Sequence, residues 1–246
     1  MGEDVLEYSH FTAAGDRPDN QDRLLVLADE ASGNYLFAVV DGMGGHRAGA
    51  EAAQAAITAL EQCWAEHDKW QNPPGWLQQM TRRCHQAVER LAVLDENSPP
   101  GATLAVLLVS SGGVWSGHVG DTRVMHYSSA GLEGRTRDHS ATELKLAAGR
   151  ITEQEAATDV DRNRVTQALG SIGTPEVSLE RWCPKGGDLM CVASDGAWSL
   201  LSDEDFSTLR EALHIRPALE QLMQARLCEA PAGQDNTTLI LLRKSK

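Results

Sequence analysis

The first half of the chain changes from short alternating apolar runs to a helical spacing. Apolar runs bounded by polar or turn-forming residues have the length of β-strands, and they occupy residues 5–11, 24–27 and 35–40. From Ala48 the apolar positions recur every three or four residues in an alanine-rich segment, and a second such stripe follows Pro73. This spacing predicts two consecutive helices, the second opened by its prolines.

The second half returns to strand character. Short Gly- and Ser-containing turns separate the apolar runs after residue 100, which favours antiparallel pairing. Residues 140–170 are polar, with two short stretches of helical character. Runs of strands, two helices, more strands and a late helix favour an α+β fold over alternating βαβ units. We expect strands at 103–109, 114–119, 123–127, 177–182, 188–193 and 237–242, and a helix at 217–228.

Composition narrows the class of protein. The 246 residues are 41% hydrophobic, enough for a sizeable core, and no repeat or low-complexity linker divides them, so one domain over 1–246 is expected. A net charge of -13 argues against nucleic acid as a partner, and no apolar stretch approaches the ~20 residues of a spanning helix, so no membrane insertion is expected. Residues 1–5 lack the basic-then-apolar pattern of a signal peptide, which predicts a cytoplasmic location. The five cysteines lack Cys-x-x-Cys spacing and are expected to be reduced.

Four aspartates stand at the ends of expected strands. Asp41, Asp121 and Asp195 each follow an apolar run, whereas Asp235 precedes one. Because the end of one antiparallel strand lies beside the beginning of its neighbour, all four can meet at one sheet edge. A single Asp in such a place is usually a turn former. Four clustered carboxylates repel one another unless a cation neutralises them, so their convergence predicts a site for a hard, oxygen-liganded metal.

The glycine-rich segment after Asp41 suggests a nucleotide-binding loop as an alternative. The dinucleotide fingerprint would need a third glycine at position 47, which is Arg47, and no βαβ unit follows. The metal site is therefore the favoured interpretation.

In order and spacing, the polar motifs of this chain resemble those of bacterial metal-dependent Ser/Thr protein phosphatases of the type 2C (PPM) family. The resemblance runs nearly end to end. It implies a four-layer α-β-β-α sandwich of two antiparallel sheets flanked by helices, with a dinuclear Mn²⁺ or Mg²⁺ centre at one end. The motifs that carry it are residues 17–22, 41–46, 48–53, 101–103, 120–123, 138–140, 165–170, 194–196 and 235–238.

The resemblance also implies roles for the aspartates. Asp41 would bridge both metal ions, and the carbonyl of Gly42 would complete one site. Asp195 and Asp235 would hold the other ion. Asp121 would contribute to a third, weaker metal site.

Three further residues would take part in catalysis by direct attack of metal-activated water on phosphorus. Arg17 would grip the substrate phosphate with its planar fork of donors. Asp22 would support the metal centre through water or a hydrogen bond. His46 would protonate the leaving oxygen, with metal-bound water as the equally favoured alternative. Gln21 is a neutral and weaker ligand than the Glu found in some relatives, so we do not expect it to bind metal directly.

The partners implied are phosphorylated protein substrates, with a bacterial Ser/Thr kinase or its targets among them, and the chain is expected to be a monomer. A flap-like segment at about 143–170 would cover the site and steer these substrates. Two alternatives stay open: a pseudophosphatase that binds without turnover, and a phosphomonoesterase acting on small metabolites.

Overall fold

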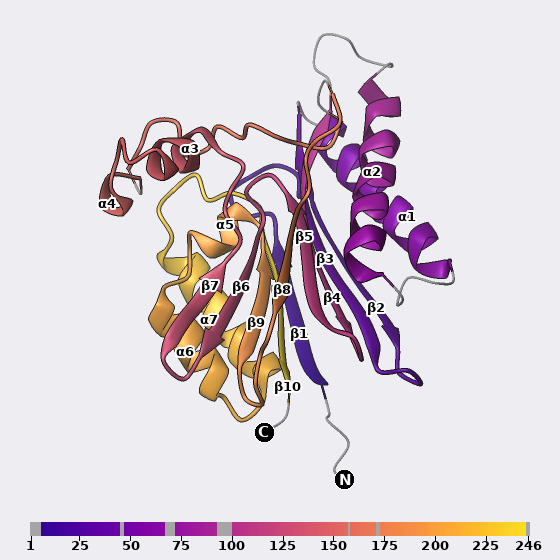
Figure 1. Ribbon diagram of the computed structural model, residues 1–246. Helices are drawn as coiled ribbons and strands as arrows, with labels where there is room; N and C mark the ends of the chain where they lie inside the picture. The colour runs from indigo at the N-terminus through magenta and orange to yellow at the C-terminus, as the bar shows by residue number, and fades with distance from the viewer. Residues whose placement is uncertain are drawn as a thin grey trace.

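Within the described residues, two five-stranded antiparallel sheets lie face to face at the centre of the molecule (Figure 1). The computed structural model describes residues 6–44, 47–66, 72–92, 100–156, 158–170 and 173–244. The first sheet has the order β1 (Leu6–Ala13), β10 (Thr237–Lys244), β9 (Leu189–Ala193), β6 (Arg123–Ser128) and β7 (Gly131–Arg135). The second has the order β2 (Asp22–Asp29), β3 (Asn34–Met43), β4 (Gly101–Ser110), β5 (Gly113–Val119) and β8 (Ser178–Trp182).

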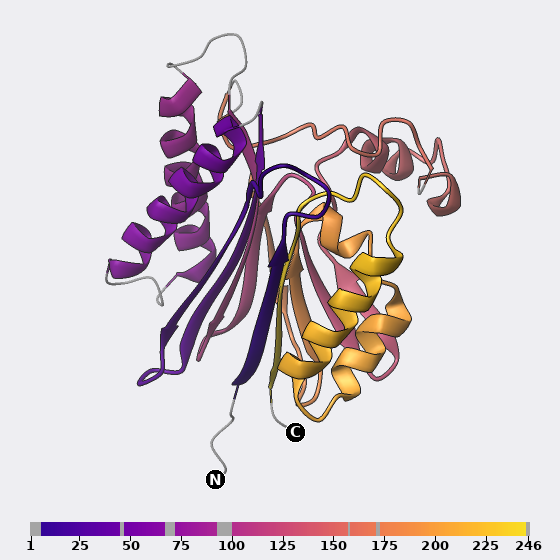
Figure 2. The same ribbon diagram turned by 180° about the vertical axis from the view of Figure 1, so that it is seen from behind.

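Helices cover the outer face of each sheet (Figures 1 and 2). Two long helices, α1 (Arg47–Ala65) and α2 (Pro73–Ala92), pack on the second sheet, and α6 (Asp203–Glu211) and α7 (Ile215–Glu229) pack on the first. The fold is therefore the predicted four-layer α-β-β-α sandwich. Three short helices, α3 (Ala141–Ala147), α4 (Glu153–Ala156) and α5 (Asp195–Trp198), lie at one end of it, where α3 and α4 project on the side of the first sheet.

The period-two alternation of β3 shows how the sequence builds the layers. Leu36 and Val40 face the helices α1 and α2, whereas Phe37 and Val39 point between the sheets. There they meet side chains of the opposite sheet such as Ile240. Both faces are apolar because the strand is covered on both sides.

The expected strands agree with the observed ones to within a few residues, but three elements have no counterpart among the expected ones: β7, α6 and the four-residue helix α5. Strand β7 reads Gly-Leu-Glu-Gly-Arg and has too little apolar character to be recognised. Helix α6 is polar, yet its beginning carries a capping box in which Ser202 and Asp205 bond each other's backbone N–H groups. That Ser-x-x-Asp spacing was an available signal.

Two further features concern expectations from the sequence: the state of the cysteines and the possibility of a membrane-spanning helix. All five cysteines are free thiols; Cys63, Cys84 and Cys191 are buried, and Cys183 and Cys228 are exposed. None of the helices in the described ranges combines the length and apolar character that a membrane-crossing segment requires.

Truncating the core between the sheets should destabilise the whole sandwich. Leu107 is fully buried there, so we expect Leu107→Ala to lower the free energy of unfolding by about 2–5 kcal/mol. Urea denaturation followed by circular dichroism measures this. As the matched control, Leu144→Ala removes a leucine that is 62% exposed and should change stability by less than about 0.5 kcal/mol. Equal losses in the two variants would contradict the assignment of Leu107 to the core.

Candidate active site

The four aspartates singled out from the sequence line one cleft at the end of the sandwich. This cleft, of about 400 Å³, is bounded by Asp41, Gly42, Asp121, Asp195 and Asp235. A larger cavity of about 840 Å³ adjoins it and shares three of the aspartates. The four aspartates converge as predicted, but at the open end between two sheets rather than at the edge of one, because Asp41 belongs to the second sheet and Asp195 and Asp235 flank strands of the first.

The strand register places two carboxylates side by side. Asp22 at the start of β2 is paired with Asp41 near the end of β3, and Asp41 is paired in turn with Thr103 on β4. Asp41 has the same parity as Phe37 and Val39, so it continues the row that points between the sheets. The cleft is thus the open end of the core between the two sheets.

Asp22 joins the two sheets beneath the cleft. It is buried, and its Oδ2 accepts a hydrogen bond of 2.8 Å from Ser194 Oγ at the end of β9. Its Oδ1 makes no hydrogen bond of ordinary geometry within the described part of the chain. Burial raises the pKa of Asp22 to about 6, although the bond from Ser194 acts in the opposite direction. The carboxyl is held in place yet remains short of a positive partner.

The other carboxylates share this shortage. Burial raises the pKa of Asp41 well above its ordinary value, and the charges of Asp22 and Asp195 raise it further. Burial and then the charge of Asp235 raise the pKa of Asp195. For Asp121, burial and then the charge of Asp195 raise the pKa to about 7. Such mutual repulsion is relieved by a cation.

Close backbone contacts fix the positions of these aspartates. A Cβ atom on Gly196 would lie 2.1 Å from the carbonyl oxygen of Asn236, so only glycine lets the segment after Asp195 approach the segment after Asp235. Similarly, a Cβ on Gly42 would lie 2.0 Å from the carbonyl oxygen of Gly49 in the first turn of α1. These two contacts explain why a glycine follows Asp195 and Asp41.

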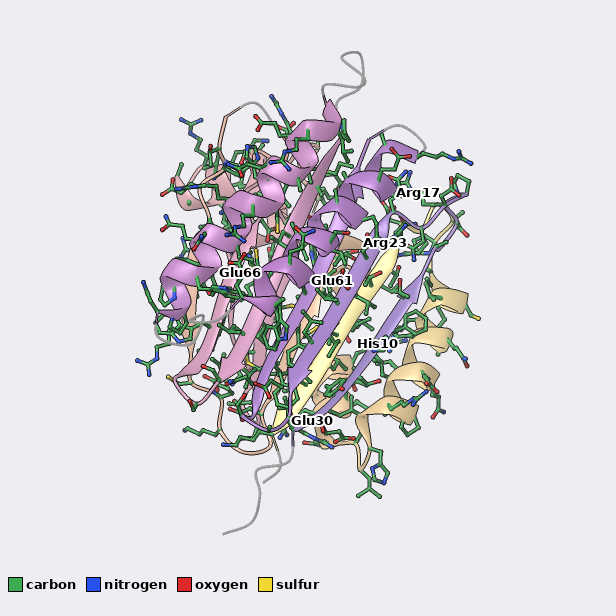
Figure 3. All side chains as sticks on the ribbon, turned by 90° about the vertical axis from the view of Figure 1, so that its right-hand side faces the viewer. His10, Arg17, Arg23, Glu30, Glu61 and Glu66 are labelled. Atoms are coloured by element: carbon green, nitrogen blue, oxygen red, sulfur yellow. The ribbon has the colours of Figure 1, made fainter. Side chains whose placement is uncertain are left out.

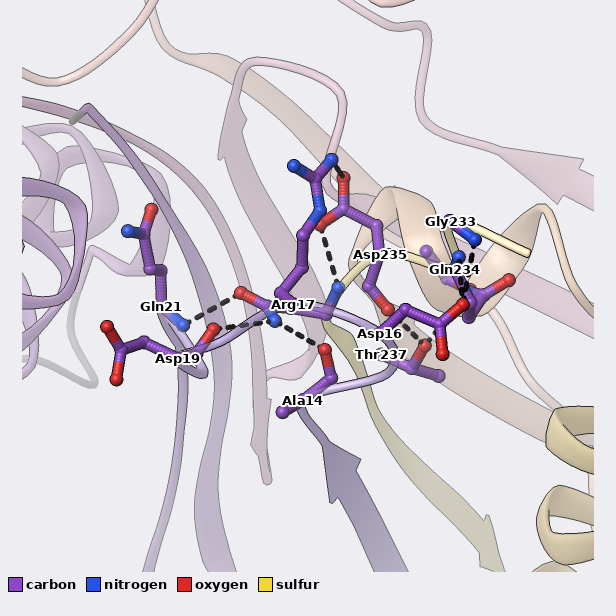
Figure 4. Close-up of polar contacts among 11 residues, drawn as sticks. Ala14, Asp16, Arg17, Asp19, Gln21, Gly233, Gln234, Asp235 and Thr237 are labelled. Carbon is purple, nitrogen blue, oxygen red and sulfur yellow. Dashed lines mark hydrogen bonds and ion pairs between the residues drawn. The ribbon is translucent and has the colours of Figure 1, made fainter. Parts of the chain in front are cut away.

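Arg17 lies on a loop that leans on the segment around Asp235 (Figure 4). Asn236 organises the loop: its Oδ1 accepts from the backbone N–H of Gln21, and its Nδ2 donates to the carbonyl oxygens of Ala14 and Asp19. The guanidinium of Arg17 contacts Asp235 Oδ2 at 2.7 Å, and both side chains are about half exposed.

Figure 3 places Arg17 at the end of the sandwich opposite to Glu30, with Arg23 between them along that side. Arg17 also lines both the cleft and the larger cavity. The predicted phosphate ligand therefore stands at the rim of the carboxylate cleft.

The turn that carries Asp121 is held from several sides. Gly120 has φ +98°, and a Cβ there would lie 2.4 Å from Thr103 Cγ2, so both conformation and space require glycine. On the other side, Trp198 Nε1 donates to the carbonyl oxygen of Asp121 at 3.0 Å. The guanidinium of Arg123 stacks on the Trp198 ring at 3.3 Å.

Arg123, which stacks on Trp198 beside the Asp121 turn, also bonds Asp138, a residue to which the sequence analysis gave no role. Its Nε and Nη2 donate to the two carboxylate oxygens of Asp138 at 2.8 and 2.7 Å. Arg123 and Asp138 both belong to motifs on which the family resemblance rests, and this membership was the signal in the sequence that pointed to them. Their pairing depends on loops brought together by the fold and could not be read from spacing.

The donor set suits a hard cation completed by water. Carboxylate and carbonyl oxygens are the ligands that Mg²⁺ and Mn²⁺ prefer, and Mg²⁺ usually keeps several waters. Among the described residues, no group of three or more His, Cys, Asp or Glu side chains closes around a single point. The buried Oδ1 of Asp22, which lacks a hydrogen-bond partner among the described residues, is the kind of group that supports a bound water. The residues fit such a centre.

Two further residues of the sequence analysis are His46 and Gln21, and the expectation that Gln21 does not bind metal directly stays a prediction. His46 lies outside the described residues, so its role stays a prediction. Gln21 lies at the rim of the cleft, and a Cβ atom on Gly49 would be 2.3 Å from its Oε1.

Comparison with known proteins agrees with this geometry. The family model for protein phosphatase 2C matches residues 14–230. The protein phosphatase PhpP of Streptococcus pneumoniae is 27% identical to this chain, and the alignment covers 96% of this chain and 97% of PhpP. The serine/threonine phosphatase of S. agalactiae has a similar structure, with a TM-score of 0.88 and 28% identity over 97% of this chain and 99% of its own.

A further solved structure is the catalytic domain of the serine/threonine protein phosphatase PstP in complex with two manganese ions. It has a TM-score of 0.80 and 25% identity, covering 98% of this chain and 99% of its own. With matched motifs over nearly its whole length and the same sandwich, the chain belongs to the protein phosphatase 2C family and is a protein-serine/threonine phosphatase.

Proposed function

We propose that this phosphatase is metal-dependent and hydrolyses phosphoserine and phosphothreonine in proteins by direct attack of water. The observation that carries the proposal is the convergence of Asp41, Asp121, Asp195 and Asp235 on one cleft with Arg17 at its rim. Mn²⁺ or Mg²⁺ is the proposed cofactor, with two ions in the centre and a third at Asp121.

Each carboxylate has a proposed place around these ions. Asp41 is central and would touch both, with the carbonyl of Gly42 beside it, and Asp195 and Asp235 would hold the second ion. When bound, the ions activate water for attack on phosphorus and neutralise the charge of the phosphate. Asp22 would anchor a water ligand through its free Oδ1 while Ser194 fixes its other oxygen.

Arg17 would bind the phosphate oxygens of the substrate. Its guanidinium is exposed, lines the cleft and is paired with Asp235. An exposed pair of this kind is weak, so the guanidinium can turn to a phosphate, for which its planar fork of donors is suited. His46 would give the proton to the leaving Ser or Thr oxygen, a role that rests on the sequence.

The substrates of a Ser/Thr protein phosphatase are phosphorylated proteins, and we propose that here they include a bacterial Ser/Thr kinase or its targets. The segment 143–170, which contains most of α3 and all of α4, is proposed to act as a flap within a single domain, because Glu143 and Asn163 line the larger cavity beside the cleft. A monomeric state and a cytoplasmic location complete the proposal and rest on the sequence alone.

Removing the central ligand should abolish turnover. We expect Asp41→Asn to lower kcat/KM by about two orders of magnitude or more, beyond the 10- to 100-fold typical of residues that merely support metal ligands. Release of phosphate from a phosphothreonine peptide, with and without Mn²⁺ and a chelator, measures this. The control is Asp29→Asn at the far end of β2, where the carboxylate accepts a hydrogen bond from Ser32 Oγ. Full activity of the wild type in the presence of a chelator would contradict the metal-dependent mechanism.

Loss of the guanidinium should act on substrate rather than on metal. We expect Arg17→Ala to reduce kcat/KM roughly ten- to a hundredfold, the worth of about 1.5–3 kcal/mol for a charge-assisted hydrogen bond. Its Mn²⁺ affinity by calorimetry should not fall, because Asp235 loses a competing partner. Arg216→Ala, on the exposed face of α7, is the matched control. Turnover of a phosphopeptide by the wild type is compared with turnover of small phosphate esters, which distinguishes a protein phosphatase from an enzyme that acts on small metabolites. Hydrolysis of the small esters without hydrolysis of the phosphopeptide would contradict the proposal.

Asp121 separates a metal ligand from a turn former. Asn makes the same local turn bonds as Asp but carries no charge. If Asp121 holds a third ion, Asp121→Asn should fold normally, still bind two Mn²⁺ and need roughly tenfold more Mn²⁺ for half-maximal activity, the scale of one lost charged contact. Wild-type activity of this variant at limiting Mn²⁺ would leave Asp121 as a turn residue.

A further inference from the structure

His139 lies directly behind the Gly120–Asp121 turn and bonds it twice. The backbone N–H of His139 donates to the carbonyl oxygen of Gly120 at 2.8 Å. In return, the N–H of Gly120 donates to His139 Nδ1 at 3.3 Å. The residue before Asp121 is therefore clamped through both of its backbone polar groups by one histidine.

The hydrogen bonds of the ring define its tautomer. Because Nδ1 accepts a hydrogen bond, the proton of the neutral ring is on Nε2, which donates to Ser178 Oγ at 2.9 Å. The ring also stacks on the buried His118 with a centroid separation of 4.7 Å. His118 is itself anchored by a bond of 2.8 Å between its Nε2 and the carbonyl oxygen of Arg137. The acceptor that faces Gly120 is thus held by β5, by β8 and by the segment after β7.

The turn has little freedom to move away from this acceptor. Gly120 also lies against Thr103, so closely that a methyl group on Gly120 would not fit. Its φ of +98° is a conformation that glycine adopts without strain, so the restraint comes from these contacts and not from the backbone torsion. A displacement of the imidazole would therefore be transmitted to the backbone of Asp121.

His139 also binds the chain where it comes back to the sandwich after α3 and α4. The carbonyl oxygen of His139 accepts from the N–H of Thr166 at 2.7 Å, and Ser140 forms an isolated bridge with Val165. Both ends of the segment 141–164 therefore meet at His139. Asn163 and Val165, just before the return, line the cleft.

We propose that His139 is a positioning residue whose Nδ1 acceptor holds Asp121 at the cleft while its carbonyl holds the adjoining segment 141–164. The consequence for metal binding rests on the proposed role of Asp121. Loss of the acceptor should weaken the Mn²⁺ site at Asp121 and leave the two ions at Asp41, Asp195 and Asp235 in place.

The variants His139→Asn and His139→Gln distinguish the role of the Nδ1 acceptor from the role of the rest of the ring. Asn places its carbonyl oxygen close to the position of Nδ1 and can accept from Gly120, whereas Gln reaches the position of Nε2 and leaves that N–H without a partner. In the metal-free protein, amide exchange followed by NMR should show Gly120 protected in the wild type and in His139→Asn. In His139→Gln the exchange of Gly120 should be at least about tenfold faster, the scale of one lost hydrogen bond to a buried donor.

Metal titration gives the second readout. With Mn²⁺ alone, calorimetry should show the two ions of the centre bound with unchanged affinity in the wild type and in both variants. The Mn²⁺ concentration for half-maximal phosphopeptide turnover should rise roughly tenfold in His139→Gln and stay within about twofold of wild type in His139→Asn. The matched control is His126→Gln, because that histidine bonds Asp188 through Nε2 at 2.9 Å near the opposite end of β9. It should leave both readouts unchanged.

Each outcome decides between positioning and a merely structural role. Similar Mn²⁺ requirements in the Asn and Gln variants, or an unprotected Gly120 N–H in the wild type, would overturn the proposal; the wild-type measurement holds even if His139→Gln does not fold. An inactive wild type would refute the proposed function instead, and the exchange data on metal-free protein would still decide whether His139 clamps the turn.

Discussion

Repulsion among carboxylates at the open end of the inter-sheet core is the constraint on which the site depends. These groups stay close because backbone contacts, rather than attraction, gather them. Gly42 touches α1, Gly196 touches the segment before β10, and Gly120 touches Thr103, each too closely for a side chain. The free energy that holds the aspartates together therefore comes from the packing of strands and helices far from the cleft.

This division explains why the sandwich needs both of its sheets. Asp41 comes from the second sheet, whereas Asp195 and Asp235 flank strands of the first, and Asp22 bonds Ser194 across the interface. The core between the sheets ends where these polar groups begin. A shift of one sheet along the other would separate the carboxylates, so the apolar interior sets the geometry of the polar end.

The sequence predicted the site residues that lie at strand ends, but it did not predict the contacts between loops that are far apart in the chain. Asp41, Asp121, Asp195 and Asp235 could be placed together because each adjoins an apolar run, and the runs alone imply antiparallel sheets. The support of Asp121 by Trp198 and the clamp by His139 depend on the three-dimensional approach of separate turns, for which one sequence contains no pattern. Helix α6 and strand β7 were missed because their residues are mostly polar and packing decides their conformation.

Arg17 and Asp235 share one contact, and contacts that exclude each other are linked thermodynamically. In the proposed roles, a cation held by Asp235 would take away the anionic partner of Arg17, and a phosphate held by Arg17 would take away the cationic partner of Asp235. Each ligand would then favour the binding of the other by the same free energy. Because the pair is half exposed, this reciprocal cooperativity is at most about 1 kcal/mol, a factor of about five in either affinity.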